Sequence, residues 1–290
     1  MKDRWRREDV DDRELVKMIG GIIGTDTVED DCAKIPFGDD YIILSTDMLH
    51  ETTDFPTGMT DWQIGWMSAA VTISDIASDG AVPLGLLLAA GLDRPERLKG
   101  IMQGAKACCD EYGASLIGGD VDAHSELTIV TTGIGRVEKE NYTGRKGALP
   151  GDLVCIVGDP GYAQAALDGD ARYRDYLLIP KPFVYEGREL SKAGVSSMMD
   201  VSDGLALSLY DLADLNGVGF EIDSGKLPKT LPQDYVLYGG GDFGLLFTCE
   251  ESILRSLEVG ATVIGRVISD AGVFVDGKTV ERRGYVHKWD

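Results

Sequence analysis

The chain has 290 residues, and its 49 acidic and 28 basic side chains give a formal net charge of −21. This length is enough for about two domains of roughly 150 residues, each with its own hydrophobic core. The acidic charge argues against binding of nucleic acid, which requires a basic surface. Phosphates can still bind to an acidic protein, provided that cations lie between them and the carboxylates.

Other classes of protein are also disfavoured. The first fifteen residues are dense in charge, so we expect no signal peptide. The most apolar stretch, residues 81–92, is too short for the roughly 20 residues of a membrane span. The five cysteines are scattered, which favours reduced thiols and a cytoplasmic location. The three histidines share no metal-ligand spacing, which argues against a zinc enzyme.

In the first half of the chain, the sequence predicts strands that alternate with helices. Residues 41–46 are β-branched and aromatic and predict a strand that ends at Asp47. Residues 60–79 predict a helix with Thr60 as its N-cap and Gly80 after its end. The elements expected next are a strand at 84–90, a helix at about 94–112, a strand at 114–117, a loop with the sequence GGDVD at 118–122, and a strand at 127–135.

The predicted helix at 60–79 carries a polar stripe. Ser68, Thr72, Asp75 and Asp79 follow one another at steps of four, three and four residues, which places them on one face. Two carboxylates on one stripe of an otherwise apolar helix indicate a functional face. The alternative is a face in contact with solvent.

A polar, glycine-containing segment at 136–151 predicts a domain boundary near residue 148. The two domains would then be an N-terminal domain, 1–148, and a C-terminal domain, 149–290. In the second half we expect strands at 153–158 and 197–203, helices at 183–193, 204–215 and near 250–257, and several shorter strands. This alternation predicts two α/β domains.

Acidic residues gather where predicted strands and helices end. Five motifs carry them: EDDCA (29–33), STD (45–47), TISDIASDG (72–80), GGDVD (118–122) and MDVSDG (199–204). Mg²⁺ binds through a few carboxylates together with water and substrate phosphates. The alternative for any single motif is a turn or a helix cap, where Asp and Ser are favoured. The five motifs together predict a magnesium site.

The common nucleotide-binding motifs are missing from the sequence. It contains no G-x-x-x-x-G-K-[ST] motif, and the D-F-G within GDFG (241–244) lacks the other protein-kinase motifs. If the chain handles ATP, metal ions and glycine backbone would contact the phosphates in place of a P-loop lysine.

The order of these motifs resembles that of the thiamine-monophosphate kinases, a family of the aminoimidazole ribonucleotide synthetase superfamily. The resemblance rests on DDCA, STD, SD-x-A-x-x-GA-x-P, LIGGD, D-x-SDGL and GG-x-D-[FY]-x-L-x-F, and it runs from about residue 29 to about residue 249. It implies ATP-dependent phosphorylation of thiamine monophosphate to thiamine diphosphate. It also implies a two-domain α/β (α+β) fold like that of aminoimidazole ribonucleotide synthetase, with a homodimer formed through the N-terminal sheet.

The resemblance also implies roles for individual residues. The metal ligands would be Asp30, Ser45, Thr46, Asp47, Asp75, Asp120, Asp200 and Asp203. Gly119, Asp120, Arg145 and Ser202 would hold ATP, and Asp54, Gly241 and Tyr285 would lie on the substrate side. Several Mg²⁺ ions would neutralise both substrates and the charge in transfer. No catalytic histidine is needed, because the acceptor phosphate oxygen is already ionised at pH 7.

The sequence departs from the family pattern on the acceptor side. Asp54 stands where many members have histidine, and Gly241 and Gly244 replace two glutamates. One alternative is therefore an ATP-dependent kinase or ligase of the same superfamily that acts on another small phosphorylated substrate. The other alternative is a nucleotide or thiamine-phosphate sensor without catalytic activity.

Overall fold

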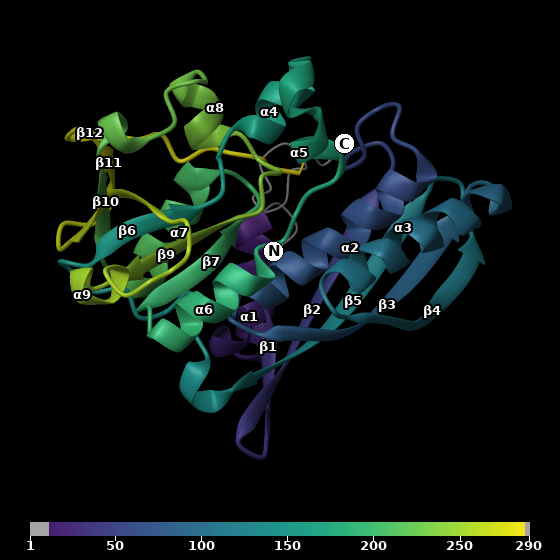
Figure 1. The fold of residues 1–290 in the computed structure, drawn as a ribbon, viewed down its shortest axis with the longest axis horizontal. Coiled ribbons are helices and arrows are strands. Elements are labelled where there is room, and N and C mark those ends of the chain that lie inside the picture. The colour runs from purple at the N-terminus through teal and green to yellow at the C-terminus, as the bar shows by residue number, and fades with distance from the viewer. Residues whose placement is uncertain (1–11, 288–290) are drawn as a thin grey trace, which may run out of the picture.

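The computed structural model describes residues 12–287 and contains two β-sheets (Figure 1). Most of the segment in which no signal peptide is expected, residues 1–11, lies outside the described residues, as do residues 288–290. The first sheet has the strand order β1-β2-β5-β3-β4. Its strands are β1 (Ala33–Phe37), β2 (Asp40–His50), β3 (Val82–Leu92), β4 (Ser115–Ala123) and β5 (Thr128–Glu138).

Two helices, α2 (Asp61–Ser78) and α3 (Leu98–Glu111), lie together on one face of the first sheet (Figure 1). The predicted helix at 60–79 is confirmed, and its N-cap Thr60 forms a capping box with Gln63. A Cβ atom at Gly104 would lie 1.8 Å from the carbonyl oxygen of Trp62. Glycine therefore allows the backbones of the two helices to approach closely where they cross.

The prediction of a loop at GGDVD is wrong, because residues 118–122 belong to β4. This strand pairs in parallel with β3, and Gly119 lies opposite Leu88. A Cβ atom at Gly119 would lie 1.7 Å from the carbonyl oxygen of Leu88. The glycine that suggests a turn in the sequence is instead required by close contact between two strands. Two further elements, β1 and α1 (Asp12–Ile23), are absent from the sequence prediction.

The second sheet has the order β12-β11-β8-β10-β6-β9-β7. Its strands are β6 (Leu153–Val157), β7 (Ser197–Val201), β8 (Gly219–Ile222), β9 (Gly244–Cys249), β10 (Thr262–Ile268), β11 (Gly272–Val275) and β12 (Lys278–Thr279). Apolar side chains from both of its faces are buried. One cluster joins the sheet to α7 (Leu205–Asn216) and α8 (Gln233–Tyr238), and another joins it to α6 (Val184–Ala193) and α9 (Glu251–Leu254).

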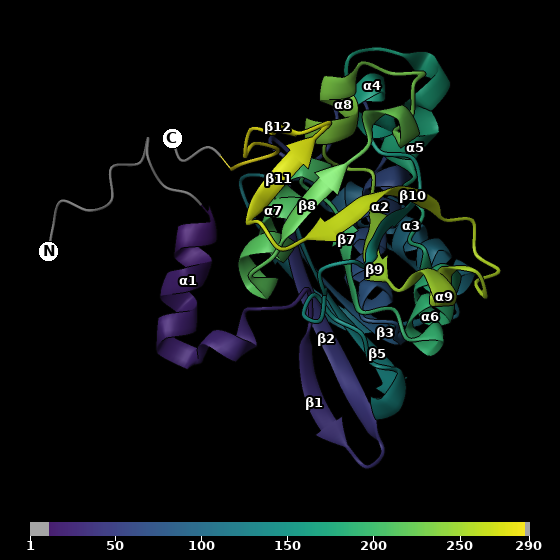
Figure 2. The ribbon, with the colours of Figure 1, turned by 90° about the vertical axis from the view of Figure 1, so that its left-hand side faces the viewer.

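The remaining helices are short. They are α4 (Tyr162–Leu167), α5 (Arg174–Leu178) and 3₁₀ turns at 25–27, 95–97, 139–141, 171–173 and 224–226. Figure 2 shows α1 to one side of both sheets. Within residues 12–287, none of the helices combines the length and the apolar character that crossing a bilayer demands.

Helix α2 connects the two halves of the molecule. It packs against the first sheet on one side and against α6 and β7 on the other. The indole nitrogen of Trp66 donates a hydrogen bond of 2.8 Å to the carbonyl of Pro180. The segment near residue 148 lies between β5 and β6, and the domain boundary there stays a prediction. A residue on α2 can therefore meet residues of both halves.

Candidate active site

The polar stripe of α2 faces the protein interior. Ser68, Thr72 and Asp79 are fully buried. The Thr72 hydroxyl donates to the Asp47 carboxylate over 2.5 Å, and the Ser45 hydroxyl donates to Asp75 over 2.5 Å. The prediction of a functional face is supported, and the alternative of a solvent-exposed face is wrong. These two hydrogen bonds join the polar face of α2 to the STD motif (45–47) of β2.

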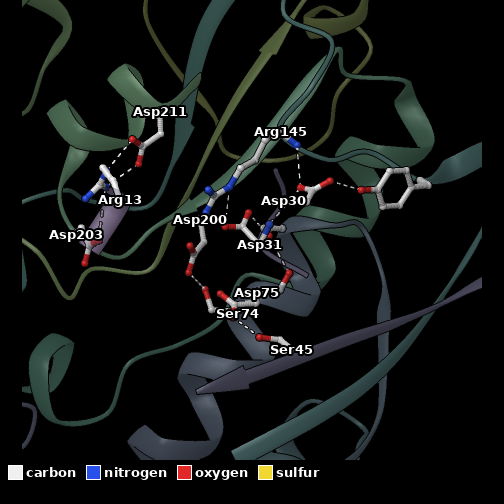
Figure 3. Close-up of polar contacts among 12 residues, drawn as sticks. Arg13, Asp30, Asp31, Ser45, Ser74, Asp75, Arg145, Asp200, Asp203 and Asp211 are labelled. Carbon is white, nitrogen blue, oxygen red and sulfur yellow. Dashed lines mark hydrogen bonds and ion pairs between the residues drawn. The ribbon is translucent and has the colours of Figure 1, made fainter. Parts of the chain in front are cut away.

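Three carboxylates meet beside this stripe, and we call Asp31, Asp75 and Asp200 the acidic cluster (Figure 3). One oxygen from each lies within 4.8 Å of the others. The three residues come from the segment before β1, from the last turn of α2 and from β7, so the cluster joins the two halves. The Ser74 hydroxyl orients Asp200 with a hydrogen bond of 2.8 Å.

The acidic cluster is electrostatically unfavourable without a cation. Burial raises the pKa of Asp75 well above its usual value, and the nearby carboxylates of Asp47, Asp200 and Asp31 raise it further. Burial, followed by the charge of Asp31, raises the pKa of Asp200 to about 8. Hard cations with oxygen ligands relieve such repulsion, and Mg²⁺ prefers this donor set. The residues present therefore fit a magnesium site.

Arg145 is the basic partner of the cluster. Its guanidinium donates to one Asp31 oxygen from both Nε, over 3.0 Å, and Nη2 (Figure 3). The side chain of Asp31 is 2% exposed and that of Arg145 is 26% exposed. Arg145 thus neutralises one carboxylate while part of its side chain stays exposed.

A cavity of about 1090 Å³ opens beside the acidic cluster. Six of the residues predicted for the site line it: Asp47, Asp54, Ser202, Asp203, Gly241 and Tyr285. No motif in the sequence points to the wall between residues 164 and 178, which comes from α4, α5 and the turn between them. Because Asp47 lines the cavity and also raises the pKa of Asp75, the cavity and the cluster are parts of one site.

The acceptor-side residues have their own local contacts. The Asp54 carboxylate accepts hydrogen bonds of 2.7 Å from the His50 backbone N–H and from the Thr53 hydroxyl. Gly241 has a φ of 88° and donates its N–H to the Ser202 carbonyl over 2.7 Å. Asp54 therefore stabilises its own turn, and Gly241 shapes the cavity wall through its backbone.

Asp203 lies at the edge of the cavity, away from the acidic cluster (Figure 3). Its carboxylate is 3.7 Å from the guanidinium of Arg13 on α1. Arg13 also forms two hydrogen bonds, of 2.8 and 2.7 Å, with Asp211 on α7. Arg13 is not predictable from the sequence, because nothing in the pattern of α1 shows that it reaches the second half of the chain.

Thr46, Gly119 and Asp120 are among the predicted residues that do not join the acidic cluster within one chain. Asp47 on β2 and Gly119 on β4 are separated by β5 and β3. At about 4.8 Å per strand, this places their backbones roughly 14 Å apart. Asp120 and Thr46 are exposed, and alternation along their strands directs them away from α2. Direct ligands of one Mg²⁺ lie about 2.1 Å from it, so Asp47 and Asp120 of one chain cannot share an ion.

Asp31 is a residue that the sequence analysis missed, although it is adjacent to the predicted ligand Asp30. The Asp30 carboxylate accepts hydrogen bonds from the Tyr142 hydroxyl and, over 3.0 Å, from the Arg145 backbone N–H. Only Asp31 of the two is a member of the acidic cluster. The motif DDCA contains both residues, and the backbone path decides which one turns toward α2.

The chain matches two domain families along most of its length. Residues 29–137 match the AIR synthase related protein, N-terminal domain, and residues 150–278 match the C-terminal domain of the same family. A relative from Methanospirillum hungatei, named thiamine-monophosphate kinase, is 50% identical over 286 residues, which cover 97% of this chain and 100% of the relative. Another from Archaeoglobus fulgidus with the same name is 37% identical and covers 94% and 97% of the two chains.

Solved structures show the same similarity in three dimensions. A structure described as AaThiL complexed with AMPPCP and TMP has a TM-score of 0.92 and 27% identity, covering 99% of this chain and 100% of that chain. Thiamine-monophosphate kinase from Stenotrophomonas maltophilia has a TM-score of 0.78 and 29% identity, covering 84% and 88%. The predicted two-domain α/β fold is confirmed, and the chain belongs to the AIR synthase related protein family.

Proposed function

We propose that this chain transfers the γ-phosphoryl group of ATP to the phosphate of thiamine monophosphate and forms thiamine diphosphate. The observation that carries the proposal is the junction between the acidic cluster and the large cavity that Asp54, Gly241 and Tyr285 line. The relatives at 50% and 37% identity have the name of this kinase, and their similarity extends over nearly the whole chain. A sensor without catalytic activity would not require a buried group of three carboxylates.

In this reaction, an oxygen of the acceptor phosphate attacks the γ-phosphorus and ADP leaves. The acceptor phosphate is mostly ionised at pH 7, since its second pKa is about 6, so no side chain has to remove a proton. Bound Mg²⁺ would supply charge neutralisation for both substrates. Asp31, Asp75 and Asp200 would hold it, and Arg145, which pairs with Asp31, would contact a phosphate oxygen.

A panel of phosphorylated acceptors tests the proposal. Purified protein with ATP and Mg²⁺ should form thiamine diphosphate from thiamine monophosphate with the highest kcat/KM of the panel. A faster reaction with another phosphorylated acceptor would favour the alternative kinase or ligase. ATP binding without any product would favour the sensor.

The stabilising effect of Mg²⁺ should grow between pH 5 and pH 8. The pKa of Asp200 is about 8 in the folded chain, against about 3.9 for an unfolded aspartate. The folded chain binds this proton more tightly, so the contribution of Asp200 to metal-free stability is fully present below about pH 4 and is lost as pH rises toward 8. Melting curves with Mg²⁺ and with EDTA across this range measure the effect. A difference that is constant with pH would contradict the assignment of the cluster as the metal site.

Asp54→Ala should raise the KM for thiamine monophosphate and leave the KM for ATP nearly unchanged. The carboxylate lines the cavity with Tyr285, and burial, followed by the charge of Asp54, raises the pKa of the Tyr285 hydroxyl. A cation at about 4 Å would gain roughly 4 kcal/mol before desolvation at an effective dielectric of about 20. Asp54→Asn keeps the turn contact to His50 and serves as the matched variant. If Asp54→Asn behaves as the wild type, the carboxylate only stabilises the turn.

We further infer a homodimer formed through the first sheet, in which Asp120 of the partner subunit completes the metal site. Two observations support it. Asp120 lies on the edge strand β4, too far from Asp47 of its own chain. Large apolar side chains are also exposed on the strands of this sheet: Met48 at 59%, Leu84 at 48%, Leu87 at 39% and Ile117 at 54%. Such an apolar area is typical of an interface.

Light scattering during gel filtration should give a mass twice that of the 31.3 kDa chain. Leu87→Lys should produce monomers and remove kinase activity, because a charge in the middle of the apolar area opposes association. Leu149→Lys is the control, since Leu149 is 62% exposed in the segment between the two sheets. A monomeric wild type that retains activity would contradict the dimer.

The inferred cytoplasmic location agrees with the five cysteines, all of which are buried free thiols.

A further inference from the structure

A second group of carboxylates shares only Asp31 with the acidic cluster. One oxygen each from Asp30, Asp31 and Asp79 lies within 4.8 Å of the others. Asp79 is the C-cap residue of α2, and its backbone has a φ of −88° and a ψ of 7°. None of the roles assigned above uses Asp79.

Asp79 is a buried carboxylate without a hydrogen-bond partner. Its residue is 0% exposed, and neither of its oxygens accepts a hydrogen bond from any described residue. The free carbonyl groups at the end of a helix add partial negative charge at this position. A buried and unpaired carboxylate there costs several kcal/mol unless a cation or a proton compensates it.

The other two carboxylates are held in place by neutral donors and by Arg145. The Ser78 hydroxyl donates to Asp31 over 2.9 Å, and Tyr142 donates to Asp30. Each of these oxygens keeps a second lone pair for another ligand. A Cβ atom at Gly144 would lie 2.1 Å from an oxygen of Asp30, so the backbone closes directly over the group. The backbone at Gly144 therefore covers the Asp30 side of the group.

Basic side chains compensate this group only in part. Arg145 forms its ion pair with Asp31 and none with Asp79. Lys34 and Arg145 both act on Asp79 through their charge, and the Lys34 ammonium lies 4.0 Å from the centre of the Tyr142 ring. Within the described residues, no basic nitrogen comes within ion-pair distance of Asp79. Three carboxylates thus share one guanidinium, which is paired with Asp31, and the charge of one ammonium.

We propose that Asp30, Asp31 and Asp79 bind a divalent cation that prefers oxygen ligands, Mg²⁺ or Mn²⁺, at a site separate from the acidic cluster. Carboxylate oxygens are the ligands of choice for these ions, and oxygens on opposite sides of an Mg²⁺ ion are about 4.2 Å apart. Asp79 is fully buried, and the three carboxylates need no phosphate ligand, so the site binds its ion in the absence of nucleotide. Because Asp31 belongs to both groups, this ion would fix the position of Asp31 for the acidic cluster.

Binding of Mn²⁺ without nucleotide tests the site. Electron paramagnetic resonance of free Mn²⁺ during titration counts the ions bound by the wild type, Asp79→Asn and Asp75→Asn. We expect Asp79→Asn to bind one ion fewer than the wild type and Asp75→Asn to keep that ion. Equal binding by the wild type and Asp79→Asn would overturn the proposal. Loss of the same ion in Asp75→Asn alone would overturn it too, because the ion would then lie in the acidic cluster.

Thermal unfolding provides a second measurement that does not depend on the kinase reaction. Asp79→Asn removes an unpaired charge while keeping the shape of the side chain, so the variant should fold without metal. Adding Mn²⁺ to the metal-free protein should raise the melting temperature of the wild type by several degrees more than that of Asp79→Asn. In Asp30→Asn, Mn²⁺ should raise the melting temperature only as much as in Asp79→Asn. Increments that are equal in all three proteins would overturn the proposal. Failure of the kinase assay alone would leave these results unaffected.

Discussion

Asp75→Asn is expected to lower kcat by about 10³-fold while leaving the metal-free chain at least as stable as the wild type. Asp75 belongs to the acidic cluster with Asp31 and Asp200 and accepts a hydrogen bond from Ser45. Loss of its charge weakens the binding of the cations that neutralise the phosphates. A 10³-fold loss in kcat corresponds to about 4 kcal/mol of lost transition-state stabilisation. The same change removes a repelled, buried charge, so the fold should not suffer.

Steady-state kinetics at saturating Mg²⁺ and melting curves in EDTA measure the two effects separately. Asp61→Asn is the matched control, because it makes the same substitution at the other end of α2. Asp61 binds Arg97 over 2.9 Å and does not line the cavity. If Asp75→Asn kept full activity, the acidic cluster would not be the catalytic metal site.

Arg145→Ala is expected to cost about 3 kcal/mol of folding free energy and to weaken ATP binding. Removing the guanidinium leaves the Asp31 carboxylate, 2% exposed, without its ion-pair partner. Breaking a buried ion pair on one side typically costs 3–5 kcal/mol, and the 26% exposure of Arg145 places this pair at the lower end. Loss of a contact to a phosphate would weaken the binding of ATP by about 2 kcal/mol.

Urea denaturation in EDTA gives the folding free energy, and calorimetric titration gives the affinity for ATP. Arg145→Lys keeps the positive charge but cannot contact Asp31 through two nitrogens. Compared with Arg145→Ala, it should therefore recover part of the folding free energy and part of the ATP affinity. Lys106→Ala removes an exposed pair with Asp110 and should change the folding free energy by less than about 1 kcal/mol. Unchanged ATP affinity in Arg145→Ala would mean that Arg145 only supports Asp31.

The sequence predicts the parts of the site that depend on local periodicity. The four-three-four spacing on α2 places Thr72 and Asp75 on one stripe, and the structure turns that stripe toward Asp47 and Ser45. The strand at 41–46 is likewise confirmed inside the longer β2. These features follow from helix and strand geometry, which a single chain segment determines.

Features that depend on contacts between distant segments are not predictable in this way. Asp30 and Asp31 are adjacent, and only their distance from α2 and β7 selects Asp31 for the acidic cluster. The glycines of GGDVD suggest a turn, but they are required by the backbone of β3 next to them. Asp120 cannot be placed from its motif, because the strand order that separates it from Asp47 is a property of the whole sheet.

The most direct test of the account follows the γ-phosphorus of ATP by ³¹P NMR during a reaction with thiamine monophosphate and Mg²⁺. We predict that the β-phosphorus signal of thiamine diphosphate and the signals of ADP grow together in a one-to-one ratio, without inorganic phosphate. The Asp75→Asn protein should show neither signal on the same time scale. Release of inorganic phosphate from ATP without thiamine diphosphate would contradict direct transfer between the two phosphates.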